Sequence, residues 1–192
     1  MGNRKMLIKT LVPVLIIAVI GGMWWLKNHP KDSEGSAIDQ SEAIMGELPE
    51  HLQDADFSLA ITEAVDFEAM SSFGLPIIVD YGADSCIPCK EMAPVLEKLN
   101  AEMYGKAFIK FADVWQYAEA ASNVPIQVIP TQVLVNADGT PFLPSEELAS
   151  QIEFLMYSDR ETDEHIFTVH QGGLTEDQMR LILAEIGVES LD

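Results

Sequence analysis

Residues 77–99 read Ile-Ile-Val-Asp-Tyr-Gly-Ala-Asp-Ser-Cys-Ile-Pro-Cys-Lys-Glu-Met-Ala-Pro-Val-Leu-Glu-Lys-Leu. An apolar run of strand length is followed by a short turn and then by Cys86 and Cys89, which open a segment with helical spacing. These are the only two cysteines in the chain. Two thiols spaced C-x-x-C at a helix start are close enough to form a disulfide, and the free backbone N–H groups there favour a thiolate on the first sulfur. The pattern indicates a dithiol that gives or takes two electrons.

Within this pair, Cys86 is the candidate nucleophile, exposed at the helix N-terminus, and Cys89 the resolving thiol. Two other interpretations stay open. A purely structural disulfide would close a two-residue loop, which constrains the unfolded chain very little. Zinc binding would use both cysteines with His165 and His170, and the spacing within each pair is usual for zinc ligands. However, about 75 residues separate the two pairs. We therefore expect no metal site.

The pattern resembles the thioredoxin superfamily through five features in register. They are Asp80 six residues before the first cysteine, the motif Cys86-Ile87-Pro88-Cys89, Lys90, Pro94 five residues after Cys89, and Ile129-Pro130-Thr131 before a strand at 132–136. The resemblance covers roughly residues 55–190, apart from an insertion near 143–165. It implies an α/β fold with a thioredoxin-like central mixed β-sheet flanked by helices, and the alternating strand and helix patterns agree with this fold class.

Asp80 interrupts an otherwise apolar strand, which is costly unless the carboxyl is useful or well paired. By resemblance it lies beneath Cys89 and acts as the acid/base that deprotonates this thiol when a mixed disulfide is resolved. Burial would raise its pKa toward the working range. The alternative is an Asp that caps the following turn. Lys110, on the next strand, is a possible ion partner of Asp80.

Ile129-Pro130 matches the cis-proline of the superfamily, which packs against the redox pair and leaves the backbone of Ile129 free to bind an extended substrate segment. A trans, merely structural proline is the alternative. Ile87 and Pro88, between the cysteines, complete the expected substrate-binding residues. No cofactor is expected other than the redox-active disulfide of the cysteine pair.

Three features depart from the family pattern. Ser85 stands where an aromatic residue usually precedes the first cysteine, and Gly82 stands where a tryptophan is common. The surface around the pair is therefore expected to be less apolar. The insertion is rich in acidic residues and is expected to contain a helix from Ser145 to Met156, either as a solvated appendage or as a docking surface.

The charge is distributed very unevenly along the chain. From Asp32 onward there are 31 acidic and six basic residues, a formal charge of −25, whereas the basic residues before it have no acidic counterpart. Nucleic-acid binding needs a basic footprint, so the domain is not expected to bind nucleic acid.

Thr10 to Leu26 is an uncharged, largely apolar run. As a helix it would measure about 25 Å, near the short limit for a bilayer span. The excess of basic residues before it predicts the N-terminus inside and the rest of the chain outside. We thus expect a cytoplasmic segment at 1–9, a transmembrane anchor at 10–26, an acidic flexible tether at 27–54 and a thioredoxin-like domain at 55–192. A cleaved signal peptide is the alternative.

Together these features predict a single-pass cell-membrane protein whose domain is an extracytoplasmic thiol–disulfide oxidoreductase, more a reductant than an oxidant. The residues between the cysteines offer no side-chain donor to stabilise a thiolate, which is why a reductant is favoured. Its partners would be the thiols and disulfides of client proteins and, by resemblance, a membrane electron donor of the CcdA or DsbD type. A thioredoxin-fold binding or scaffold module without required redox turnover is the alternative.

Overall fold

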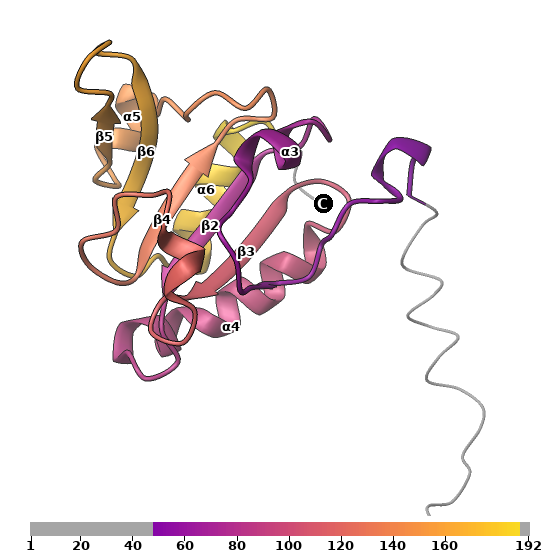
Figure 1. Cartoon of the computed structure of the whole chain (residues 1–192), viewed down its shortest axis with the longest axis horizontal. Helices are drawn as coiled ribbons and strands as arrows, with labels where there is room; N and C mark the ends of the chain where they lie inside the picture. Colours follow the sequence, from indigo (N-terminus) through magenta and orange to yellow (C-terminus); the bar gives the residue numbers. More distant parts are fainter. Residues whose placement is uncertain (1–47, 189–192) are drawn as a thin grey trace, which may run out of the picture. The chain divides into compact units, whose positions relative to one another are not determined.

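The computed structural model describes residues 48–188. In chain order the elements are η1 (Glu50–Leu52), β1 (Ala60–Ile61), α3 (Phe67–Ser71), β2 (Ile77–Gly82), α4 (Ile87–Glu102), β3 (Phe108–Asp113), η2 (Ala118–Ala121), β4 (Thr131–Val135), α5 (Glu146–Ala149), β5 (Leu155–Ser158), β6 (His165–Gln171) and α6 (Glu176–Glu185). Strands and helices alternate along most of this length (Figure 1).

The six strands form one sheet in the order β1-β3-β2-β4-β6-β5, which Figure 1 shows from β5 and β6 on the left to β3. The pairs β1–β3 and β2–β3 are parallel, whereas β2–β4, β4–β6 and β5–β6 are antiparallel. The sheet is therefore mixed, and the predicted thioredoxin-like fold class is confirmed.

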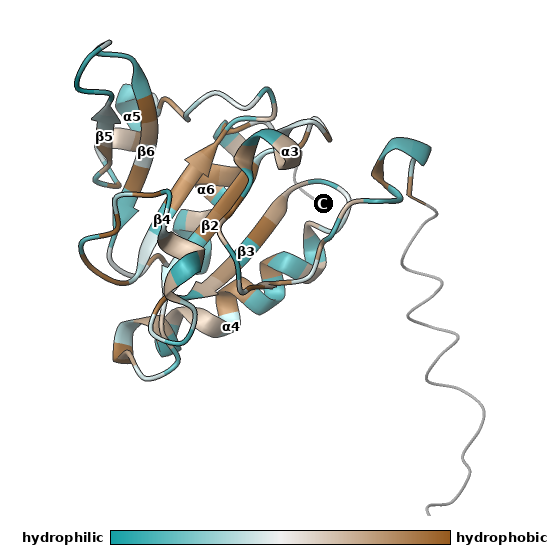
Figure 2. Ribbon diagram, viewed as in Figure 1, coloured by the Kyte–Doolittle hydropathy of each residue, from teal (hydrophilic) through white to brown (hydrophobic). Residues whose placement is uncertain are grey.

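Strand β2 lies in the middle of the sheet and is buried along its whole length. Because side chains alternate across a strand, Ile77 and Val79 enter the core cluster on the side of α3 and η2. Ile78 enters the opposite cluster, together with buried residues of α4 and α6. This double coverage explains the continuous apolar run in the sequence, and the central strands are mostly brown in Figure 2.

Helix α4 begins directly after Cys86, its N-cap residue. Pro88 lies in the first turn, where the missing N–H removes no intrahelical hydrogen bond. Met92, Leu96 and Leu99 recur at helical spacing and are buried against the sheet. Helix packing therefore fixes the end of α4 that carries both cysteines next to the end of β2.

The helix expected from Ser145 to Met156 is largely wrong. Only Glu146–Ala149 is helical, with Ser145 as N-cap, and Leu155–Ser158 forms strand β5 instead. β5 pairs antiparallel with β6, so that Met156 lies opposite Thr168. Backbone hydrogen bonds to β6 thus outweigh the helical tendency of this segment, because strand propensity depends strongly on its neighbours. The insertion extends the sheet by one edge strand.

The expected cytoplasmic segment 1–9, the anchor 10–26 and most of the tether 27–54 lie outside the described residues. Between residues 48 and 188, no helix is both long enough and apolar enough to cross a membrane.

Candidate active site

The two cysteines form a disulfide at the N-terminus of α4, with their Cα atoms 5.3 Å apart. The Sγ atom of Cys86 accepts a hydrogen bond of 3.4 Å from the backbone N–H of Cys89. Cys86 is less accessible than expected, because only 8% of its surface is exposed, against 3% for Cys89. The expectation of an exposed Cys86 is therefore wrong for the disulfide state, although it remains the more accessible sulfur of the two.

Asp80 lies inside β2 and is completely buried. It faces the α4 side of the sheet, and its Oδ1 accepts a 2.6 Å hydrogen bond from Nε2 of Gln132. Its Oδ2 has no hydrogen-bond partner among the described residues. Burial raises the pKa of Asp80 to about 7, and the hydrogen bond from Gln132 opposes this rise. The carboxyl is paired within the sheet rather than capping the following turn.

Gly82 ends β2 between this carboxyl and the disulfide. A Cβ atom at Gly82 would lie 3.2 Å from Sγ of Cys89, 3.3 Å from Oδ2 of Asp80 and 2.8 Å from the ring of Phe111. A side chain at Gly82 would therefore collide with the ring of Phe111, and its absence lets Sγ of Cys89 and Oδ2 of Asp80 both lie close to this end of β2.

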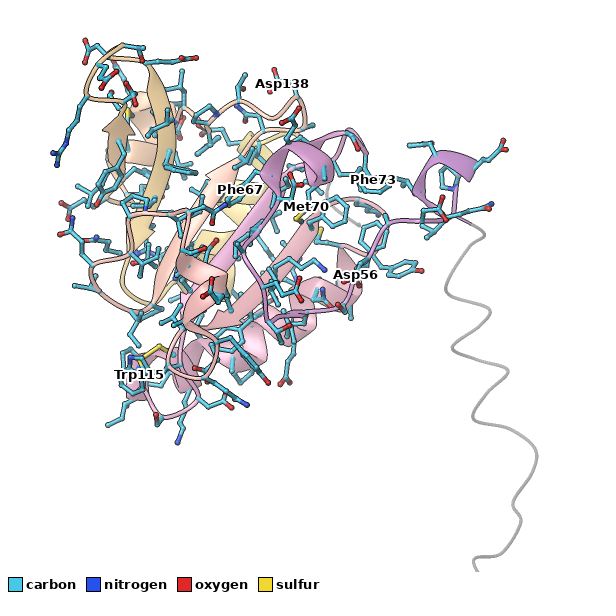
Figure 3. The ribbon with its side chains drawn as sticks, viewed as in Figure 1. Asp56, Phe67, Met70, Phe73, Trp115 and Asp138 are labelled. Atoms are coloured by element: carbon cyan, nitrogen blue, oxygen red, sulfur yellow. A yellow bond between two sulfur atoms is a disulfide. The ribbon has the colours of Figure 1, made fainter. Side chains whose placement is uncertain are left out.

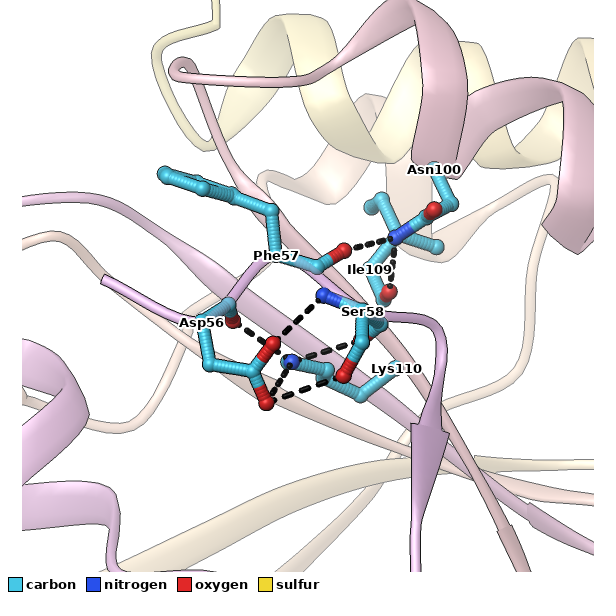
Figure 4. Close-up of polar contacts among 6 residues, drawn as sticks. All are labelled: Asp56, Phe57, Ser58, Asn100, Ile109 and Lys110. Carbon is cyan, nitrogen blue, oxygen red and sulfur yellow. Dashed lines mark hydrogen bonds and ion pairs between the residues drawn. The ribbon is translucent and has the colours of Figure 1, made fainter. Parts of the chain in front are cut away.

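Lys110 is not the ion partner of Asp80. Asp80 lies opposite Phe111 in the β2–β3 register, so Lys110 points to the other face of the sheet. There its ammonium donates hydrogen bonds of 2.6 Å to the backbone carbonyls of Asp56 and Ser58 (Figure 4). Burial lowers the pKa of Lys110, and the carboxylate of Asp56, 3.5 Å away, opposes this.

The same close-up shows Asn100, whose amide donates to the carbonyls of Phe57 and Ile109 (Figure 4). Lys110 and Asn100 thus hold residues 56–58 with side-chain donors, and strand β1 itself is limited to Ala60–Ile61.

The peptide bond between Ile129 and Pro130 is cis, as the resemblance implied. Ile129 packs against the small cluster formed by Ala83 and the two cysteines. Within residues 48–188 neither the N–H nor the carbonyl of Ile129 takes part in a hydrogen bond. Both groups are therefore available beside the disulfide for an extended partner chain.

Exposed side chains surround the disulfide. Ile87 is 72% exposed and Pro88 is also exposed, as expected for residues that contact a substrate. Trp115, which no sequence motif singled out, is 65% exposed and lies at the disulfide end of the molecule in Figure 3. The carboxylate of Asp113 connects the turn before α4 with the loop after β3, because it accepts hydrogen bonds from the N–H groups of Asp84 and Trp115. The one sequence signal for Trp115 was its position just after the predicted strand that contains Lys110.

His165 and His170 both lie on β6 and make local hydrogen bonds. Nδ1 of His170 is 2.8 Å from the carbonyl of Glu153, and Nε2 of His165 is 2.9 Å from the hydroxyl of Thr168. In the part of the chain that the structure describes, no three His, Cys, Asp or Glu side chains are grouped to hold a metal ion.

This geometry defines a class of protein. A disulfide at a helix start can exchange with other thiols, a buried carboxyl with a pKa near neutrality can move the proton, and free backbone groups can hold the partner chain. These are the requirements of a thiol–disulfide oxidoreductase.

Comparison with known proteins agrees with this class. The family model described as Thioredoxin matches residues 58–152. Thioredoxins of several Staphylococcus aureus strains are 38% identical to the chain over 99 residues, which cover 48% of this chain and 92% of theirs. The chain belongs to the thioredoxin family, and its substrates are protein thiols and disulfides.

Solved structures of thioredoxins are also similar to the chain. Chloroplastic thioredoxin z shares 23% identity with a TM-score of 0.45, over 68% of this chain and 95% of that one. Fasciola hepatica thioredoxin shares 24% identity with a TM-score of 0.44, over 66% of this chain and 97% of that one.

Proposed function

We propose that this chain is a membrane-tethered, extracytoplasmic thiol–disulfide oxidoreductase that works mainly as a reductant of client proteins. The observation that carries the proposal is the position of the Cys86–Cys89 disulfide, next to the buried carboxyl of Asp80 on one side and the unpaired backbone of Ile129 on the other.

In the proposed cycle, the reduced pair begins with a thiolate on Cys86. This thiolate attacks one sulfur of a client disulfide, forms a mixed disulfide and releases the other client sulfur as a thiolate. Asp80 then takes the proton from the thiol of Cys89, and the resulting thiolate attacks Sγ of Cys86. The client leaves as a dithiol after protonation, having gained two electrons, and the Cys86–Cys89 disulfide is restored.

Client binding is proposed to use Ile129, Pro130, Ile87 and Pro88. An extended client segment would pair with the free N–H and carbonyl of Ile129, which supply main-chain hydrogen bonds without selecting a sequence. Exposed Ile87 and Trp115 would provide apolar contact beside the attacked sulfur. The client is therefore expected to present its disulfide in an extended or locally unfolded segment.

The direction of electron flow is inferred from the donors around Cys86. The single hydrogen bond that its Sγ receives among the described residues comes from the N–H of Cys89, at 3.4 Å. Pro88 has no N–H to add. Weak stabilisation of the thiolate favours the disulfide form, which makes the reduced pair a good electron donor. Since the proposed location is outside the cytoplasm, reduction of the pair would require a membrane donor of the CcdA or DsbD type.

The tether is inferred from the sequence of residues 1–54. The proposed domain boundaries remain a cytoplasmic segment at 1–9, an anchor at 10–26, a tether at 27–54 and a catalytic domain at 55–192. The topology can be tested with a tag after Asp192. The tag should stay in the membrane fraction and be removed by protease added to intact cells. A secreted form starting near residue 36 would instead indicate a cleaved signal peptide.

The redox function can be tested by equilibrating the full chain with glutathione buffers. The expected midpoint lies closer to about −270 mV, the thioredoxin value, than to about −120 mV, the DsbA value. The chain should also reduce insulin when a dithiol is supplied, and Cys86→Ser should abolish this activity. A pair that stays reduced under mildly oxidising conditions would contradict the reductant role. Unchanged biological activity of Cys86→Ser would favour a binding module.

A further inference from the structure

We propose that Gln132 is a positioning residue that gives the two oxygens of Asp80 different tasks. It holds Oδ1, so that Oδ2 is left to exchange a proton with Cys89 beside Gly82. This inference rests on the proposed acid/base role of Asp80.

The orientation of the Gln132 amide follows from its two neighbours. Gln132 lies opposite Asp80 in the β2–β4 register. Its Nε2 is 2.6 Å from Oδ1 of Asp80 and 3.1 Å from the carbonyl oxygen of Gly172. A backbone carbonyl can only accept a hydrogen bond, so the nitrogen end of the amide must face Gly172. The other N–H is then directed to Oδ1 of Asp80.

The second oxygen of Asp80 faces the redox pair. Oδ2 is buried without a partner in the described part of the chain. A Cβ atom built on Gly82 would lie 3.3 Å from this oxygen and 3.2 Å from Sγ of Cys89, so both atoms flank the same glycine. Oδ2 is therefore the oxygen of Asp80 that lies toward the thiol of Cys89, whose proton a base must accept during resolution.

A small cavity lies beside Cys89. Its volume is about 120 Å³, and Cys89, Ala83 and Phe111 contribute to its walls, whereas Asp80 does not. A cavity of this size has room for a few water molecules. Water in this cavity would therefore contact Cys89 and not the carboxyl of Asp80.

On the elements packed around Asp80, all within residues 48–188, no charged side chain is placed to neutralise its carboxylate. Lys110 of β3 points to the opposite face, and His170 of β6, which lies opposite Gln132, is directed to the carbonyl of Glu153. The other ionisable groups near the cavity are Asp84, Lys90 and Glu97, all exposed. Asp113, at the end of β3, binds loop N–H groups. Gln132 is therefore the main polar group that acts on the buried carboxyl.

The test compares Gln132→Met, which keeps the volume and removes the N–H donor, with Thr168→Val. Thr168 is buried on the same side of the sheet but donates to the carbonyl of Phe142 instead of Asp80. The full chain in its disulfide form is titrated by carboxyl ¹³C NMR, where no thiol interferes. Wild type should titrate at Asp80 near pH 7. Gln132→Met should raise this midpoint by about one pH unit, because a hydrogen bond to a charged group is lost, and Thr168→Val should not.

A second variant tests the proton route itself. Gly82→Ala places a methyl group 3.3 Å from Oδ2 of Asp80 and 3.2 Å from Sγ of Cys89, and it also displaces the ring of Phe111, which lies 2.8 Å from the new methyl. It should slow resolution of a mixed disulfide at least about tenfold, since positioned acid–base groups contribute more than this. An unchanged midpoint in Gln132→Met, equal shifts in both NMR variants, or an unchanged resolution rate in Gly82→Ala would overturn the proposal. A wild-type chain that reduces no disulfide would instead refute the proposed function, and the NMR titration would still test Gln132.

Discussion

Replacing Asp80 with Asn should stabilise the protein at neutral and alkaline pH. The folded-state pKa of Asp80 is raised from 3.8 to about 7 by burial. The unfolded chain therefore loses this proton at lower pH than the folded chain does. Between these two pKa values the folded state binds more protons, so the stability of the wild type decreases as the pH rises. Each pKa unit corresponds to about 1.36 kcal/mol, which gives a total cost of about 4 kcal/mol above pH 7. Asn has almost the same shape but no charge and avoids this cost.

Urea unfolding of the disulfide form at several pH values would measure this effect. From pH 5 to pH 8.5 the stability advantage of Asp80→Asn over wild type should grow by about 3 kcal/mol and then level off. Asp84→Asn, which removes an exposed carboxyl four residues along the chain from Asp80, is the matched control and should show no such growth. If the difference between Asp80→Asn and wild type did not depend on pH, Asp80 would not be the buried, proton-binding group described here.

Two further predictions concern the cysteine pair and the chain before β1. In the reduced protein at neutral pH, Cys86 should react with iodoacetamide faster than Cys89, because it occupies the N-cap of α4 and is the more accessible sulfur. Peptide mass spectrometry would measure the two labelling rates, and equal rates would contradict the assignment of roles. Lys110→Met should lower the free energy of unfolding by about 2 kcal/mol, the scale for hydrogen bonds to a charged group. It should also increase amide hydrogen exchange around residues 56–61. Unchanged exchange there would show that Lys110 does not hold this segment.

The parts of the site that could be predicted from the sequence are those with local signals. The apolar run of β2 and the cysteine pair at a helix start each depend on neighbouring residues, and the structure has both. The cis bond before Pro130 was predicted from the family resemblance and is confirmed. Local sequence and resemblance were thus sufficient for most of the fold.

The parts that were missed depend on register between distant strands. A one-residue offset on β3 decides whether Lys110 or Phe111 lies beside Asp80, and the sequence contains no signal for this offset. Gln132 is 52 residues from Asp80 and gives no local sign of a functional role. The segment that forms β5 is similarly determined by its pairing with β6. Long-range pairing, and not residue type, controls these features.

The cost of burying Asp80 is best explained by the two directions of the redox cycle. When Cys89 attacks the mixed disulfide, the enzyme needs a base that accepts its proton. When a donor later reduces the pair, Cys89 must regain a proton from an acid. A single group serves both steps only if its pKa lies near the working pH. Burial alone moves the pKa of Asp80 upward, and the hydrogen bond from Gln132 limits this rise to about 7. In the proposed cycle, the same burial that lowers stability at this position is what makes the carboxyl usable in both steps.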